Sequence, residues 1–314
     1  MAHIGLICGV DVSADTLDAC IGRGGAHQRF ANTAAGVAEL VGFCRLHRIE
    51  LVVMEATGGY ERRPFAWLWA ASIACAIVNP RAVRRFAEAM GLLEKTDRID
   101  AGVIAWYALV KRIVAQPPAS QTQRELAALV THLRQLTELR TTARNQRRLV
   151  ENREVLASFT TLLAVITRQI RGLESKIAAL IDDDPLWRAL NAEFRTVKGV
   201  ASRTVARLLA ELPEIGTLSH KATAKLVGLA PIARDSGKAS GKRSVRGGRA
   251  GVRSILFVVA AVVRRYEPDF AAFHQRLADA GKPKMVVRTA VAHKLLTRLN
   301  AKARDVRRCL PHPA

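Results

Sequence analysis

The chain has 314 residues, 49% of them hydrophobic, and it carries 49 Lys and Arg against 27 Asp and Glu, a formal net charge of +22. This hydrophobic content excludes a disordered tail, and no apolar run reaches the roughly 18 residues of a membrane span. A surface needs a charge of only about 2–8 for solubility. The excess therefore indicates a polyanionic partner, and nucleic acid is the expected one.

The positive charge is concentrated toward the C-terminus. From Arg195 to Ala314 there are 25 Lys and Arg against 7 Asp and Glu, a net of +18, while the preceding residues carry +4. The five cysteines form no CxxC pair and the histidines show no ligand spacing, which argues against zinc and against a disulfide framework. The first residues lack a signal-peptide pattern, so a cytoplasmic protein with no membrane association is expected.

Residues 1–116 have the pattern of an α/β domain. Strands are predicted at Ile4–Val12, Thr16–Ile21, Gln28–Ala31, Leu51–Met54 and Ala74–Val78, and helices at Thr33–His47, Arg62–Ser72, Asn79–Met90 and Asp97–Val114. The first three strands are close enough in sequence to pair as a meander. The later strands are joined by crossover helices and should therefore run parallel.

Residues 117–185 are predicted to be a long helical region after a Pro-rich linker. From Gln121 to about Ala179 the chain has a helical pattern with an apolar stripe, made by Leu126, Leu129, Leu133, Leu136, Leu139, Leu149, Leu156, Leu162, Leu163 and Ile166. One helix cannot bury such a stripe alone. A coiled coil between subunits, in a homodimer or homotetramer, satisfies it, and so does a helical hairpin within one chain.

Residues 186–314 follow a helix break at Asp182–Pro185 and are predicted to be a basic, mostly α-helical domain. Within it, Val197–Val200 followed by Arg203–Leu212 resembles a helix-hairpin-helix element. There, a glycine turn and the next helix N-terminus offer backbone N–H groups to a phosphate. Lys198, Gly199 and Arg203 are candidate nucleic-acid contacts, although an ordinary helix turn explains the pattern as well.

Four acidic residues stand at the ends of predicted elements. Asp11 ends one buried strand, Glu55 ends another, and Asp97 and Asp100 lie one turn apart at the start of a helix. The carboxyl ends of parallel neighbouring strands meet at one sheet edge, and residues at i and i+3 share a helix face. Mg²⁺ prefers oxygen ligands, and crowded carboxylates repel one another without a cation. The pattern predicts a site for Mg²⁺, with Mn²⁺ as an alternative, acting on a phosphodiester.

Simpler explanations of these acids also hold. Asp97 as a helix N-cap, with Asp100 as a favourable first-turn charge, accounts for that pair alone. Asp15 and Asp18 are further acids nearby, but the first is predicted in a turn and the second in the middle of a hairpin.

A basic, glycine-rich segment follows in the C-terminal domain. Between Arg234 and Arg253 there are seven basic residues and one acidic residue, and the glycines let the backbone approach a phosphate closely. Ser236 is a candidate nucleophile, although on spacing alone a local Asp-Ser-Gly turn explains it better, and Ser240 and Ser244 are not excluded by chemistry. The candidate nucleic-acid contacts here are Arg234, Lys238, Lys242, Arg243, Arg246, Arg249 and Arg253.

Several stretches together resemble the DEDD-type bacterial insertion-sequence transposases and the related Piv-type site-specific DNA invertases. They are GVDVSADTLDACI, VVMEATGGYERRPFAWLW, NPRAVRRFAEAMGLLEKTDRIDAGVIAWYA, FRTVKGVASRTVARLLAEL and LVGLAPIARDSG. The resemblance covers nearly the whole chain in the family's order. It implies a RuvC-like domain of ribonuclease-H fold over 1–116, an oligomerising coiled coil over 117–185, and a transposase domain over 186–314. It makes Asp11, Glu55, Asp97 and Asp100 the metal ligands and Ser236 catalytic.

The activity implied by this resemblance is Mg²⁺-assisted cutting and rejoining of donor and target DNA through a phosphoserine, guided by a structured RNA. The chain departs from the family pattern at Val245–Arg249, where a Lys-Arg-Gly step is usual, and at Asp235, where a neutral amide is common. Two alternatives remain. One is a metal-dependent, structure-specific nuclease such as a junction resolvase, and the other is a non-catalytic nucleic-acid-binding protein.

Overall fold

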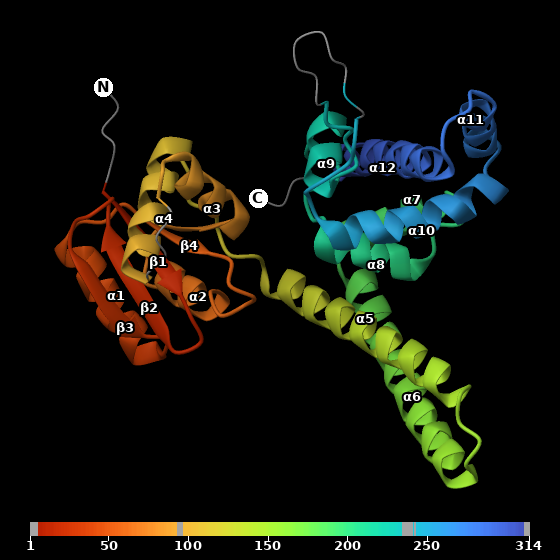
Figure 1. Cartoon of the computed structure of the whole chain (residues 1–314), viewed down its shortest axis with the longest axis horizontal. Helices are drawn as coiled ribbons and strands as arrows, with labels where there is room; N and C mark the ends of the chain where they lie inside the picture. The colour runs from red at the N-terminus through yellow and green to blue at the C-terminus, as the bar shows by residue number, and fades with distance from the viewer. Residues whose placement is uncertain (1–5, 93–96, 234–240, 242, 311–314) are drawn as a thin grey trace. The chain divides into compact units, whose positions relative to one another are not determined.

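The computed structural model describes residues 6–92, 97–233, 241 and 243–310, with the backbone alone for residues 97–99. The chain forms two compact units, residues 1–119 and 120–314. The first is an α/β unit and the second is helical (Figure 1). Over the described ranges, no helix combines the length and apolar character needed to cross a membrane.

A five-stranded mixed sheet forms the centre of the first unit, in the order β3-β2-β1-β4-β5. Its strands are β1 (Ile7–Val12), β2 (Thr16–Ile21), β3 (His27–Ala31), β4 (Leu51–Glu55) and β5 (Cys75–Val78). The first three form the predicted antiparallel meander, and β4 and β5 run parallel to β1, as predicted. This order and these directions confirm the expected fold of the ribonuclease-H and RuvC type.

Helices cover both faces of this sheet. Side chains alternate along each strand, so Cys8 and Val10 of β1 join the core under α1 (Ala34–Leu46) and α2 (Arg62–Ala70). The opposite face of the sheet packs against α3 (Pro80–Ala89) and α4 (Asp97–Lys111). We call this second face the α4 face.

Helix α4 lies very close to β1 at Gly9. A Cβ atom at Gly9 would stand 2.1 Å from the carbonyl oxygen of Ala101 and 2.5 Å from the backbone nitrogen of Ala105. Beyond the end of α4, the Gln116 N–H donates to the carbonyl of Cys75, the first residue of β5, at 2.9 Å. Helix α4 therefore runs antiparallel to β1, and its first turn lies toward the carboxyl ends of the parallel strands.

Replacing Gly9 with alanine is expected to destabilise the first unit by about 1–3 kcal/mol, because the added methyl group meets helix backbone that cannot rotate away. Urea unfolding followed by tryptophan fluorescence measures this. The matched control is Gly42→Ala in the middle of α1, where nothing lies within 4 Å of the added Cβ. That control should be neutral or stabilising, since alanine is the better helix former. Equal effects of the two substitutions would contradict the close packing of α4 on β1.

The second unit begins with a helical hairpin. Helices α5 (Gln121–Arg147) and α6 (Arg153–Asp183) pack on each other, and Asn152 caps α6 by accepting from the N–H groups of Glu154 and Val155. The predicted helical region is thus two helices broken at residues 148–152, and it packs on itself. Contact between subunits through this region stays a prediction.

The inner half of the hairpin shares one core with the C-terminal helices. Leu126 of α5 and Ile177 of α6 belong to the same buried cluster as Phe194 and Leu299. The remaining helices are α7 (Pro185–Arg195), α8 (Ser202–Glu211), α9 (His220–Val227), α10 (Ala250–Tyr266), α11 (Pro268–Asp279) and α12 (Lys284–Cys309). Packing therefore joins residues 120–185 to the rest of the helical unit, while the functional division at residue 185 stays a prediction.

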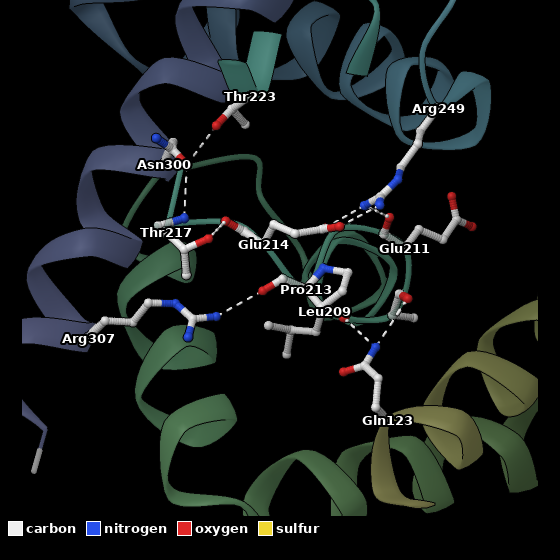
Figure 2. A network of polar contacts seen from close by, with 12 residues as sticks. Gln123, Leu209, Glu211, Pro213, Glu214, Thr217, Thr223, Arg249, Asn300 and Arg307 are labelled. Carbon is white, nitrogen blue, oxygen red and sulfur yellow. Dashed lines mark hydrogen bonds and ion pairs between the residues drawn. The ribbon is translucent and has the colours of Figure 1, made fainter. Parts of the chain in front are cut away.

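A polar network holds the segment between α8 and α9 in place (Figure 2). The buried side chain of Asn300 on α12 accepts from the Gly216 N–H at 2.8 Å and donates to the Leu218 carbonyl at 3.0 Å. Arg307 donates to the Pro213 carbonyl at 2.9 Å, and Gln123 of α5 donates to the Leu209 carbonyl at 3.0 Å. The C-terminal helix is therefore tied to the segment between α8 and α9, and the hairpin is tied to the end of α8.

Candidate active site

Asp11 and Glu55 lie at the same level near the carboxyl ends of the neighbouring parallel strands β1 and β4. Strands β1 and β4 pair up to Val10 and Met54, and each acid is the residue that follows. Residues at the same level of a parallel pair point to the same side of the sheet. Both acids therefore belong to the α4 face, and both are partly exposed.

The first turn of α4 reaches the same edge of the sheet. A strand rises about 3.3 Å per residue, so Asp11 lies about 6.6 Å beyond Gly9. A helix rises about 1.5 Å per residue, so Asp97 lies about 6 Å before Ala101, which packs on Gly9. Asp100 directly precedes Ala101. The backbone thus brings all four predicted acids toward one edge, although the side chain of Asp97 lies outside the described part of the chain.

The donor set at this edge is of the kind that a hard divalent cation binds. Carboxylate oxygens are the protein ligands that Mg²⁺ prefers, and it keeps several waters besides. Among the side chains that the structure describes, which leave out Asp97, no three His, Cys, Asp or Glu groups gather closely enough to hold a metal ion. The residues therefore fit Mg²⁺ in chemical type, but the described side chains of Asp11, Glu55 and Asp100 do not by themselves form a metal-binding group, and the metal site stays a prediction.

A fifth acid, Asp18, lies beside Asp11. The two residues are directly paired across β1 and β2, so Asp18 also points to the α4 face, and it is only 2% exposed. Arg29 donates to the Asp18 carboxylate at 2.8 Å, which compensates its charge. Asp18 lies in the middle of a hairpin, so the sequence did not indicate it as a site residue. Only the antiparallel register of β1 and β2 shows that it adjoins the candidate site.

Ile232, which precedes the basic segment, pairs with Ser244 within it. Backbone hydrogen bonds of 2.9 and 3.3 Å join Ile232 to Ser244. The predicted nucleophile Ser236 lies outside the described residues, as do Arg234, Lys238, Lys242 and Ser240. Arg243 and Arg246 are described and exposed.

Two of the predicted nucleic-acid contacts in the basic segment have partners within the protein. The Arg249 guanidinium donates to both carboxylate oxygens of Glu214 at 2.5 Å and to the Glu211 carbonyl at 2.9 Å (Figure 2). Burial raises the pKa of Glu214, but the hydrogen bonds from Arg249, a backbone hydrogen bond and the charge of Arg249 together leave the pKa below its ordinary value. Arg253 donates to the Gly247 carbonyl. Both arginines thus hold residues 247–253, the C-terminal part of the basic segment, in place.

The helix-hairpin-helix-like element is formed by α7, a glycine turn and α8. Gly199 has φ +100°, a left-handed value that favours glycine, so it is the turn residue. The Lys198 N–H donates to the Glu267 carboxylate at 2.8 Å, and Arg203 pairs with Glu174. A carboxylate of the protein therefore occupies one donor that this turn would offer to a phosphate, while the Lys198 side chain is exposed.

Two family models match the chain. Residues 8–150 match the DEDD-type IS110 model, described as a transposase, and residues 191–275 match the model described as "Transposase IS116/IS110/IS902 family". With the ribonuclease-H type sheet, these matches define a transposase, an enzyme of DNA recombination. The chain belongs to the IS110 family of DEDD transposases.

Two relatives in this family are similar over most of their length, and a third over a shorter part. The pilin gene-inverting proteins of Moraxella lacunata and Moraxella bovis are each 29% identical over 313 residues, which covers 92% of this chain and 92% of each relative. An uncharacterized 43.6 kDa protein of insertion element IS110 from Streptomyces coelicolor is 28% identical over 155 residues, covering 48% of this chain and 37% of that protein.

A solved structure of RuvC from Thermus thermophilus also matches, with 15% identity and a TM-score of 0.25. It covers 34% of this chain and 95% of that protein. The strand order and directions, rather than this likeness, define the fold of the first unit.

Proposed function

We propose that this transposase cuts and rejoins DNA by serine attack assisted by a divalent cation. The observation that carries the proposal is the shared level of Asp11 and Glu55 at the edge reached by the first turn of α4. Asp11, Glu55, Asp97 and Asp100 would hold Mg²⁺ or Mn²⁺. When bound, such a cation stabilises negative charge that develops on phosphodiester oxygens. Ser236 is assigned as nucleophile from the family resemblance.

The serine step is a phosphoryl exchange in two parts. The hydroxyl oxygen of Ser236 attacks phosphorus and loses its proton to solvent or a nearby base, while the bond to one bridging oxygen of the DNA breaks. The strand is then held as a phosphoserine diester and a free hydroxyl is released. A hydroxyl end of another strand attacks the same phosphorus, which forms a new DNA phosphodiester and returns the serine.

The proposed partners are donor DNA, target DNA and a structured guide RNA, bound by a homodimer or homotetramer. The charge of +18 between Arg195 and Ala314 supports polyanion binding by the second unit. The names of the Moraxella relatives describe inversion of a gene, which is a rearrangement that this strand exchange can produce. RNA guidance rests on the family resemblance.

Purification of the full chain with its associated nucleic acid tests the proposal. RNA that copurifies is sequenced, and labelled donor DNA is incubated with the complex in Mg²⁺ or in EDTA. On a denaturing gel, we expect protein linked to one DNA end and rejoined product, both lost in EDTA. Cleaved DNA without any protein-linked species would support the nuclease alternative and overturn the serine role. Unchanged DNA processing in EDTA would overturn the metal role.

A further inference from the structure

A hollow lined by arginines lies between the two helices of the α5–α6 hairpin. Its volume is about 530 Å³, and four guanidinium side chains line it. They are Arg144 and Arg147 on α5 and Arg168 and Arg171 on α6, which we call the arginine tetrad. Leu163, Ala164 and Thr167 complete the lining, and none of the described residues that line it is acidic.

The hairpin geometry brings these arginines together. Each helix supplies a pair at i and i+3, which places both members on one face of that helix. The short connection at residues 148–152 reverses the chain, so the two faces meet (Figure 1). A second hollow of about 440 Å³ is lined by Arg144, Arg147, Arg148 and Leu156, and shares two members of the tetrad. The basic surface therefore continues toward the connection.

The charge of the tetrad is not compensated within the described part of the chain. Elsewhere on this unit, Arg134 pairs with Glu138 and Arg203 pairs with Glu174. All four tetrad side chains are exposed, and none makes an ion pair with any residue that the structure describes. Four like charges that converge from two helices repel one another, and a bound polyanion removes this cost.

The α5 members of the tetrad lie beyond the last residue of that helix in the main buried cluster, whereas on α6 Arg168 and Arg171 are exposed beside the buried residues Ile166 and Ile170. Beyond Leu136, α5 supplies no residue to the buried cluster that joins the hairpin to the C-terminal helices, as far as the structure describes that cluster. Between residues 139 and 172 the sequence holds seven arginines and two acidic residues. This part of the hairpin is therefore strongly basic, although all the residues before Arg195 together have a net charge of only +4.

The side chains that line the hollow indicate which class of ligand it can bind. Guanidinium groups match phosphate oxygens in pairs and remain charged at any relevant pH. As far as the structure describes the lining, it contains no aromatic side chain on which a base could stack. We propose that the arginine tetrad binds the phosphate backbone of a nucleic-acid duplex, as a site separate from the carboxylates and from the basic segment. This site needs neither the metal nor Ser236, so it can fail while the proposed reaction stands.

Fluorescence anisotropy with the full chain tests this site, using short labelled duplexes of DNA and of RNA in EDTA so that cleavage does not enter. The variant carries Arg144→Gln, Arg147→Gln, Arg168→Gln and Arg171→Gln. The control removes four charges from dispersed, exposed positions, through Arg81→Gln, Arg85→Gln, Lys176→Gln and Arg188→Gln. Circular dichroism melting and light scattering establish that folding and oligomeric state match those of the unmodified chain.

The tetrad variant is expected to bind at least about tenfold more weakly than the control at moderate salt. Its plot of log affinity against log salt should be shallower by about 0.9 for each phosphate of the DNA duplex that the variant no longer neutralises. If the substitutions weaken binding of the DNA duplex only, the ligand of the tetrad is DNA. If they weaken binding of the RNA duplex only, the ligand is RNA. Equal affinities and salt slopes for variant and control would overturn the proposal. The proposal would also be overturned if the tetrad variant forms a smaller oligomer that binds the duplex probes, per oligomer, as tightly as the unmodified protein does. The tetrad would then serve contact between subunits.

Discussion

Replacing Asp11 with asparagine is expected to abolish DNA cleavage and joining while DNA binding stays intact. The substitution keeps the size of the side chain and removes the charge that a hard cation requires. A bound cation contributes several kcal/mol of charge stabilisation, so the rate should fall by at least about a thousandfold. The measurement is the rate of strand cleavage on labelled donor DNA across a series of Mg²⁺ concentrations, beside DNA affinity by anisotropy.

The control for Asp11→Asn is Asp15→Asn, which removes the same charge from an exposed turn four residues later. This control should cleave DNA at the normal rate. Removing one negative charge slightly strengthens the attraction of DNA in either variant, so weaker binding cannot explain an inactive Asp11→Asn protein. Glu55→Gln should behave as Asp11→Asn does, because both residues follow the same register pair. Normal cleavage by either substituted acid would remove it from the metal site.

The sheet was predictable from sequence because β1, β4 and β5 each contain an apolar run and each connection restricts the pairing. Three strands separated by short turns can form a meander, and strands joined by helices run parallel. The edge position of Asp11 and Glu55 follows from these rules alone. The antiparallel register that sets Asp18 beside Asp11 does not, because a shift of one residue would turn Asp18 to the other face.

The helical unit was harder to predict because its decisive contacts join residues that are distant in sequence. The break at residues 148–152 contains no Gly or Pro, and its one local sign is the capping residue Asn152. Leu139, Leu149 and Leu162 continue the apolar stripe but are exposed, because they lie on the outer half of the hairpin. No local pattern shows that Arg249 meets Glu214, which lies 35 residues earlier.

Replacing Ser236 with alanine is expected to remove both the protein-linked DNA and the rejoined product. Loss of a nucleophile removes the step itself, and in other enzymes it costs up to about a millionfold in rate. Joining should therefore fall by more than about a thousandfold, while binding of DNA and RNA is unchanged because the substitution alters no charge. The measurement is a denaturing gel of labelled DNA after incubation with Mg²⁺, with protein-linked DNA identified by protease treatment.

Ser240→Ala and Ser244→Ala are the controls for Ser236→Ala, since both remove a hydroxyl from the same basic segment. Ser244 pairs with Ile232 through backbone hydrogen bonds, so the Ser244→Ala variant keeps both of these bonds. Both controls should form the protein-linked species. A protein-linked species that is absent in Ser240→Ala or Ser244→Ala, but kept in Ser236→Ala, would move the nucleophile to that serine. If Ser236→Ala still cleaves DNA and only joining is abolished, water is the attacking group in cleavage and the chain acts on DNA as a metal-dependent nuclease.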